Sequence, residues 1–150
     1  MSSKEIKEIA SKIQGMLREE EGEFLYNLAK NCKGKGVIVE IGSWKGKSTV
    51  FLARGSKAGN KVKVYAIDPH QGSQDHQDQK VANTFGEFKK NIEKAGVADL
   101  VEFLKTTSQK ASKNWKRPIE LLWIDGDHSF PMVKLDFELS FNKRRNNCFS

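Results

Sequence analysis

The sequence predicts an α/β protein in which helices flank both faces of a parallel sheet of about four strands. Short apolar runs rich in β-branched residues alternate with segments whose apolar residues repeat every three or four positions. This alternation is typical of a parallel sheet wound with right-handed crossovers. Glycine, Asp-Pro and Asp-Gly steps follow several of the runs. We therefore expect polar groups to gather at the carboxyl edge of the sheet, where such sheets bind ligands.

The chain begins with two predicted helices. Ser2 and Glu5 form a candidate capping box, and helical spacing of apolar residues predicts one helix over about Ser3 to Arg18. The acidic run at 19–21 and Gly22 are expected to interrupt it, and a second short helix follows.

A glycine turn from Glu40 to Gly46 joins the first predicted strand, Val37 to Val39, to a helix that ends before Gly59. Glycines let the backbone approach a ligand closely, and a helix start offers unpaired amides to an anionic group. A phosphate-binding P-loop needs about four residues between its glycines, and here Gly42 and Gly46 enclose three. A dinucleotide turn needs a middle glycine, which is absent.

The remaining elements follow the same pattern of strand and helix. Ser108 is the candidate cap of a short helix, and the segment from His70 to Gln79 is polar and predicts a loop beside the glycine turn. Further strands are predicted at 62–67, 100–104 and 121–124, with helices at 81–95, 108–115 and 129–141.

Composition restricts the class of protein. Hydrophobic residues are 37% and charged residues 30%, which favours a soluble globular domain. Because no apolar run approaches the roughly eighteen residues that span a bilayer, we expect a cytoplasmic protein without a membrane partner. Cys32 and Cys148 have no metal-ligand spacing and are interpreted as free thiols.

The net charge is +7, with eight basic residues and one acidic residue between Lys33 and Lys63. Aromatic residues do not interleave with this cluster, so it favours a solvated basic face over a nucleic-acid site.

Three motifs in fixed order carry a family resemblance: Glu40 to Thr49, Ala66 to His70 and Leu122 to Phe130. Together they resemble the class I S-adenosylmethionine-dependent methyltransferases, in particular a bacterial branch with a Glu-Ile-Gly-Ser first loop and an Ile-Asp-Gly-Asp-His fourth strand end. The resemblance covers about residues 24–140. It implies a Rossmann-like sheet, S-adenosyl-L-methionine as cofactor, and O-methylation of a small polar or sugar-containing acceptor.

The resemblance also implies which residues hold the cofactor. Asp68 would accept hydrogen bonds from the ribose hydroxyls, although an aspartate before proline is also a common turn former. Thr107 and Ser108 would lie near the adenine. The methionine part would lie against Glu40, Gly42, Ser43, Gly46 and Ser48.

On the reaction side, the resemblance places Asp125 beside the methyl donor, where it would also be a ligand of Mg²⁺, a cation that prefers carboxylate oxygens. His128 would accept the proton of the acceptor hydroxyl. The alternative is that Asp125 to Ser129 forms only a turn and helix cap.

The chain departs from the family after Phe141, where no further strand is predicted. We expect helices at 1–31, an incomplete methyltransferase domain at 32–141 and a basic tail at 142–150. The fourth strand would be an open edge that offers a surface for a homo-oligomer. Two alternatives stay open: a truncated, non-catalytic remnant or interaction module, and a nucleic-acid methyltransferase.

Overall fold

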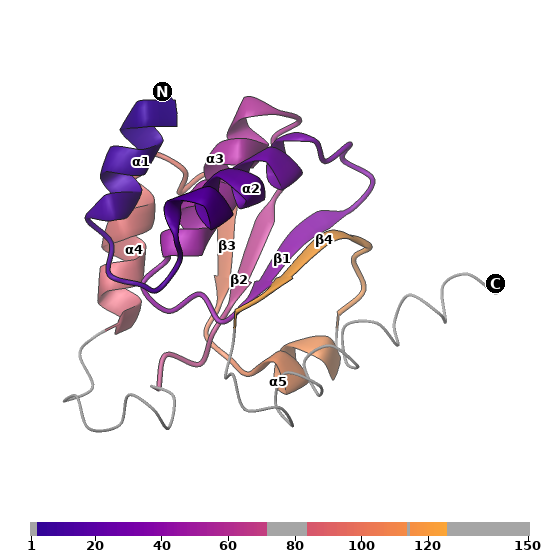
Figure 1. Cartoon of the computed structure of the whole chain (residues 1–150). Coiled ribbons are helices and arrows are strands. Elements are labelled where there is room, and N and C mark those ends of the chain that lie inside the picture. The colour runs from indigo at the N-terminus through magenta and orange to yellow at the C-terminus, as the bar shows by residue number, and fades with distance from the viewer. Residues whose placement is uncertain (1–2, 72–83, 114, 126–150) are drawn as a thin grey trace.

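Among the residues that the structure describes, the sheet has four parallel strands in the order β3-β2-β1-β4 (Figure 1). The computed structural model describes residues 3–71, 84–113 and 115–125. The strands are β1 (Val37–Ile41), β2 (Val64–Ile67), β3 (Val101–Leu104) and β4 (Ile119–Ile124). The predicted α/β class and parallel sheet are thereby confirmed.

Helices pack on both faces of this sheet. One face is covered by α1 (Ser3–Ser11), α2 (Glu19–Lys30), α3 (Lys47–Ala58) and α4 (Thr84–Lys94), and the other carries α5 (Ser108–Lys113) (Figure 1). Alternate residues of each strand point to opposite faces. Accordingly Ile38 and Val64 join the four-helix side of the core, whereas Val39 and Ile67 join the α5 side.

The first predicted helix was too long. It ends at Ser11, and the acidic run at 19–21 opens α2 instead of interrupting a helix. Negative charge is favourable at a helix N-terminus, and the Glu21 carboxylate accepts a hydrogen bond from the Arg18 N–H at 2.9 Å. The prediction extended too far because Ile13 falls at helical spacing and is buried in the core, although it does not lie in a helix.

Glycines allow α2 to lie almost in backbone contact with α3. A Cβ on Gly55 would stand 2.1 Å from the carbonyl oxygen of Tyr26, and one on Gly22 would stand 2.4 Å from the Phe51 ring. Gly22 is therefore required by packing and does not break the helix.

At the amino end of the sheet, Glu120 fastens β4 to the segment before β1. Its carboxylate accepts hydrogen bonds from the backbone N–H groups of Lys33 and, at 2.9 Å, Lys35. The register shifts there, with Val37 opposite Ile119 and Ile38 opposite Leu121. These backbone hydrogen bonds lower the pKa of Glu120 below its ordinary value.

β4 lies at one end of the strand order, as predicted. Among the described residues it pairs with β1 alone, and all its residues are half-buried. No helix within the described ranges is long and apolar enough to cross a membrane.

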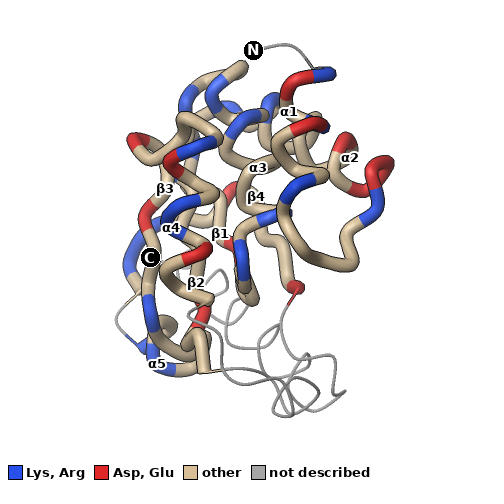
Figure 2. The backbone as a smooth tube through the Cα atoms, turned by 90° about the vertical axis from the view of Figure 1, so that its left-hand side faces the viewer, with Lys and Arg blue, Asp and Glu red and all other residues tan. Residues whose placement is uncertain are grey.

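Basic and acidic residues are both spread over the described chain (Figure 2). Within the basic cluster, Lys57 pairs with Asp99 at 3.4 Å and Lys63 pairs with Glu102 at 3.1 Å. Part of the local positive charge is therefore neutralised on the surface. The preference against nucleic acid stays a prediction.

Candidate functional site

The glycine turn lies at the carboxyl end of β1, in the middle of the sheet. Gly42 and Gly46 have φ angles of 85° and 87°, which suit glycine, and Trp44 adopts 42°. The turn closes with a 2.7 Å hydrogen bond from the Gly46 N–H to the Ser43 carbonyl oxygen. The α3 ladder begins with the Val50 N–H donating to the Gly46 carbonyl. As in any helix, the first amides of α3 have no partner within it.

Glu40 is fully buried beneath this turn. Its carboxylate accepts hydrogen bonds from the Ser48 hydroxyl, at 2.5 Å, and from the Thr49 hydroxyl. Burial raises the pKa of Glu40 to about 7, against the opposing effect of the two hydroxyls, and the charges of Asp125 and Asp68 raise it further. Glu40 therefore anchors the first turn of α3 to β1.

Asp68 connects the glycine turn to the end of β2. One carboxylate oxygen accepts the Trp44 N–H at 2.8 Å, and the other accepts the His70 N–H at 2.6 Å. The side chain is 15% exposed. A carboxylate has about four acceptor positions, so two remain for hydroxyl groups of a ligand.

Ser43 presents a buried hydroxyl in the same turn. The residue is 3% exposed, and its Oγ has no hydrogen-bond partner among the residues that the structure describes. An unsatisfied buried hydroxyl costs free energy. Such a group inside a glycine turn is compatible with a turn that completes its hydrogen bonds with a polar ligand.

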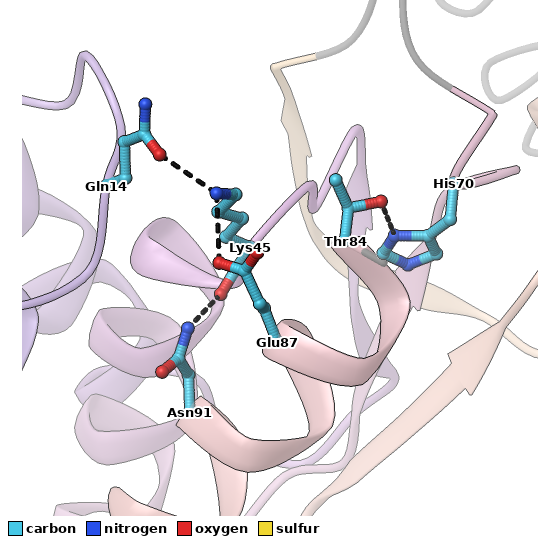
Figure 3. Close-up of polar contacts among 6 residues, drawn as sticks. All are labelled: Gln14, Lys45, His70, Thr84, Glu87 and Asn91. Carbon is cyan, nitrogen blue, oxygen red and sulfur yellow. Dashed lines mark hydrogen bonds and ion pairs between the residues drawn. The ribbon is translucent and has the colours of Figure 1, made fainter. Parts of the chain in front are cut away.

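His70 holds the chain after Asp68 against α4. Its Nδ1 lies 3.3 Å from the Thr84 hydroxyl (Figure 3), and its ring centroid lies 5.1 Å from that of Phe85. Burial lowers the pKa of His70, and the charge of Lys105 acts in the same direction against the opposing charge of Asp68. A neutral imidazole packed in this way fixes the backbone that donates to Asp68.

Thr107 and Ser108 lie after β3, where α5 begins. The Thr107 hydroxyl accepts the Lys110 N–H at 3.3 Å. Thr107 is thus the cap of α5, and the prediction of Ser108 as cap was wrong. Their assignment to adenine stays a prediction.

Asp125 is exposed at the end of β4, and its N–H donates to the Ile41 carbonyl at 2.7 Å. This hydrogen bond to the last residue of β1 places Asp125 at the same edge as the glycine turn, and its charge contributes to the raised pKa of Glu40. His128 lies outside the described residues. Within the described ranges, no three carboxylate, imidazole or thiol groups gather as a metal site.

Sequence reasoning missed three contributors to this edge: the Trp44 amide, the Thr49 hydroxyl and the His70 amide. One signal was present in the sequence, because a buried glutamate at a strand end requires hydrogen-bond donors and Ser48-Thr49 is the nearest hydroxyl pair. The backbone donors to Asp68 had no such signal.

These residues suit a ligand that carries both hydroxyl and charged groups. Asp68 has acceptor capacity for hydroxyls, Ser43 has an unused hydroxyl, and the α3 N-terminus favours an anionic group. These hydrogen-bond donors and acceptors therefore fit the ribose and carboxylate of the predicted cofactor.

Comparison with known proteins gives one family match and many structural ones. A family model described as "Methyltransferase domain" matches residues 39–149. The O-methyltransferase from Bacillus cereus, solved with SAH, is 24% identical with a TM-score of 0.63, over 93% of this chain and 60% of that chain. TomG from Streptomyces achromogenes, an O-methyltransferase of tomaymycin synthesis solved with SAM, is 18% identical with a TM-score of 0.67, over 95% and 61%.

Cofactor-bound Rv0187 from MTB is 24% identical with a TM-score of 0.61 and covers 92% of this chain and 58% of that chain. At such identities these likenesses support the fold. The chain spans about three fifths of the length of these solved chains.

Proposed function

The chain belongs to the family of class I S-adenosylmethionine-dependent methyltransferase domains, and we propose that it binds S-adenosyl-L-methionine and transfers the methyl group to an acceptor oxygen. The acceptor is a small molecule with polar or sugar-like hydroxyl groups. The family membership supports the reaction type, and the carboxyl edge of the sheet supplies the binding groups.

The bond between Asp68 and the Trp44 amide carries this proposal. It joins the end of β2 to the glycine turn, so the two segments predicted to hold the ribose and the methionine part form one unit. Asp68 keeps acceptor capacity beyond its two backbone bonds. A ligand with vicinal hydroxyls beside a charged tail would use both segments at once.

The chemistry asks for positioning more than for proton transfer. When bound, the cofactor supplies an electrophilic methyl group on a positively charged sulfur. The protein holds the acceptor oxygen in line with that methyl group, and alignment of this kind accounts for much of such a rate enhancement. Asp125 would orient the acceptor, alone or as one ligand of Mg²⁺, and His128 would take the hydroxyl proton.

The choice of oxygen as the acceptor atom is supported by the solved relatives described as O-methyltransferases, from Bacillus cereus and Streptomyces achromogenes. What those proteins methylate is a property of those proteins.

Calorimetric titration with S-adenosyl-L-homocysteine and S-adenosyl-L-methionine tests the binding half of the proposal. We expect saturable binding of both at one site. Transfer is tested with methyl-labelled cofactor against a panel of catechols and sugars, with Mg²⁺ and with EDTA. Absence of binding by folded protein would contradict the proposal. Binding without transfer to any acceptor would support the alternative of a cofactor-binding module.

A further inference from the structure

Lys45 joins three separate parts of the molecule at the glycine turn. Its ammonium donates to the Gln14 side-chain oxygen at 2.9 Å and pairs with the Glu87 carboxylate at 2.9 Å (Figure 3). Gln14 belongs to the segment 12–18 between α1 and α2, and Glu87 belongs to α4. The Lys45 side chain is only 12% exposed, whereas its partners Gln14 and Glu87 lie at the surface, with Glu87 44% exposed.

The backbone of Lys45 is held as well. Asn91, one turn after Glu87 on α4, donates its side-chain N–H to the Lys45 carbonyl oxygen at 2.9 Å (Figure 3). Between them on the same helix, Phe88 packs below Gly46, where a Cβ would lie 3.0 Å from its ring. α4 therefore contacts the turn through three of its residues, Glu87, Phe88 and Asn91.

The segment 12–18 is fastened to the turn by a second lysine. Lys47 donates to the Gly15 carbonyl oxygen at 3.2 Å, and a Cβ on Gly15 would lie 3.3 Å from the Lys47 side chain. The segment thus rests on the same residues that open α3. Lys45 and Lys47 lie on either side of Gly46, and both donate to the segment 12–18. The contact between this segment and the glycine turn therefore depends on the conformation of the turn.

We propose that Lys45 is a positioning residue for the cofactor, which seats the segment 12–18 on the glycine turn and holds the turn in the conformation that presents Trp44 to Asp68. The inference rests on the proposed function, because the cofactor is its ligand. Because Lys45 follows Trp44 directly, its contacts restrain the turn next to the residue whose N–H donates to Asp68. Cofactor binding and docking of the segment 12–18 therefore reinforce each other.

The test compares wild type with Lys45→Met, which keeps the alkyl chain and removes the ammonium. Lys57→Met is the matched control, because Lys57 also combines a carbonyl contact, to Gly96 at 2.7 Å, with an ion pair. Lys57 lies in the last turn of α3, away from the glycine turn. Calorimetry measures the affinity for S-adenosyl-L-homocysteine, and trypsin cleavage after the exposed Lys12 and Arg18 measures docking of the segment.

We expect Lys45→Met to weaken binding about tenfold, the scale of one charged hydrogen bond, and Lys57→Met to leave it unchanged. In wild type, the product S-adenosyl-L-homocysteine should slow cleavage after Lys12 and Arg18, and this protection should be lost in Lys45→Met. The charge swap Lys45→Glu with Glu87→Lys should recover part of the affinity that Lys45→Glu alone loses.

Equal affinities of Lys45→Met and wild type would overturn the inference, as would cleavage rates that do not respond to the product. A wild type that binds no product would contradict the proposed function and with it the coupling. Cleavage without any ligand still reports whether Lys45 holds the segment, so the two failures are distinguishable. If Lys45→Met and Lys57→Met lost affinity for S-adenosyl-L-homocysteine to the same extent, the effect would be a general one on folding, and the inference would be overturned.

Discussion

A buried or half-buried glutamate accepts hydrogen bonds at each end of the central strand β1, but the two glutamates have different donors and opposite pKa shifts. At the amino end, Glu120 is half-buried, accepts backbone N–H groups and has a lowered pKa. At the carboxyl end, Glu40 is fully buried, accepts side-chain hydroxyls and has a pKa raised to about 7. The first arrangement favours the charged carboxylate, whereas the second makes charge costly.

This difference distinguishes a structural end of the strand from the end that we propose binds the cofactor. The 33–36 loop has its amides satisfied by the protein's own carboxylate. The glycine turn retains the unused Ser43 hydroxyl and the spare acceptor capacity of Asp68. Polar groups whose hydrogen bonds the protein does not satisfy itself are expected at binding sites.

The largest expected effect concerns Glu40 and pH. Its folded pKa of about 7 lies above the ordinary 4.5, so the folded state binds the proton more tightly than the unfolded state. The contribution to stability is therefore complete below about pH 4.5 and is lost as the pH rises through about 7, by on the order of 3 kcal/mol. Denaturant titrations at several pH values should show this loss in wild type and not in Glu40→Gln.

Glu120→Gln is the control for that experiment, because the Glu120 carboxylate of the wild type has the opposite pKa shift. The stabilisation that Glu120 contributes is present above its ordinary pKa and is lost only as the pH falls through the lowered value. If Glu40→Gln and wild type changed in parallel between about pH 4.5 and pH 7, the raised pKa of Glu40 would be contradicted.

Asp68→Ala should weaken binding of S-adenosyl-L-homocysteine by about 1–3 kcal/mol, because a charged acceptor is removed from the ligand and from the Trp44 amide. Asp68→Asn should fall between Ala and wild type. Calorimetry measures the affinities, with Asp99→Ala, an exposed aspartate on the surface, as the matched control. Unchanged affinity in Asp68→Ala would refute the ribose assignment.

Glu120→Ala should lower the free energy of unfolding by about 1 kcal/mol, since the amides that it accepts are partly open to water. Cofactor affinity should not change, because these bonds lie at the opposite end of the sheet. Chemical denaturation and calorimetry on the same sample measure both. A large fall in affinity would show that the two ends of β1 are not independent.

The smallest effect on stability is expected for Ser43→Ala, within about 0.5 kcal/mol of wild type, because the hydroxyl that it removes has no hydrogen-bond partner among the described residues. Ser48→Ala should destabilise the protein more, since it deprives the Glu40 carboxylate of a donor. Denaturant titration compares the two. If Ser43 contacts the cofactor, as proposed, Ser43→Ala should also weaken binding; unchanged affinity would remove it from the binding residues.

Much of the fold followed from local patterns. The bounds of α3 agree with the glycines at 46 and 59, because a glycine at a helix end reflects backbone conformation that depends on few neighbours. The position of Asp68 at the end of β2 followed from the Asp-Pro step, which stops a strand. The predicted helix from Ser3 to Arg18 was too long because Ile13 is buried without being helical. The spacing of apolar residues indicates which residues are buried, and it indicates the backbone conformation only indirectly.

By itself, the sequence determined the alternation of strands and helices and the polar residues at the carboxyl edge, since both depend on spacing along one segment. Only the tertiary structure decided which groups those residues bind. Glu40 meets hydroxyls on α3, and Lys45 meets Gln14 and Glu87 from distant segments. These contacts arise from the packing of separate elements, and no local pattern encodes them.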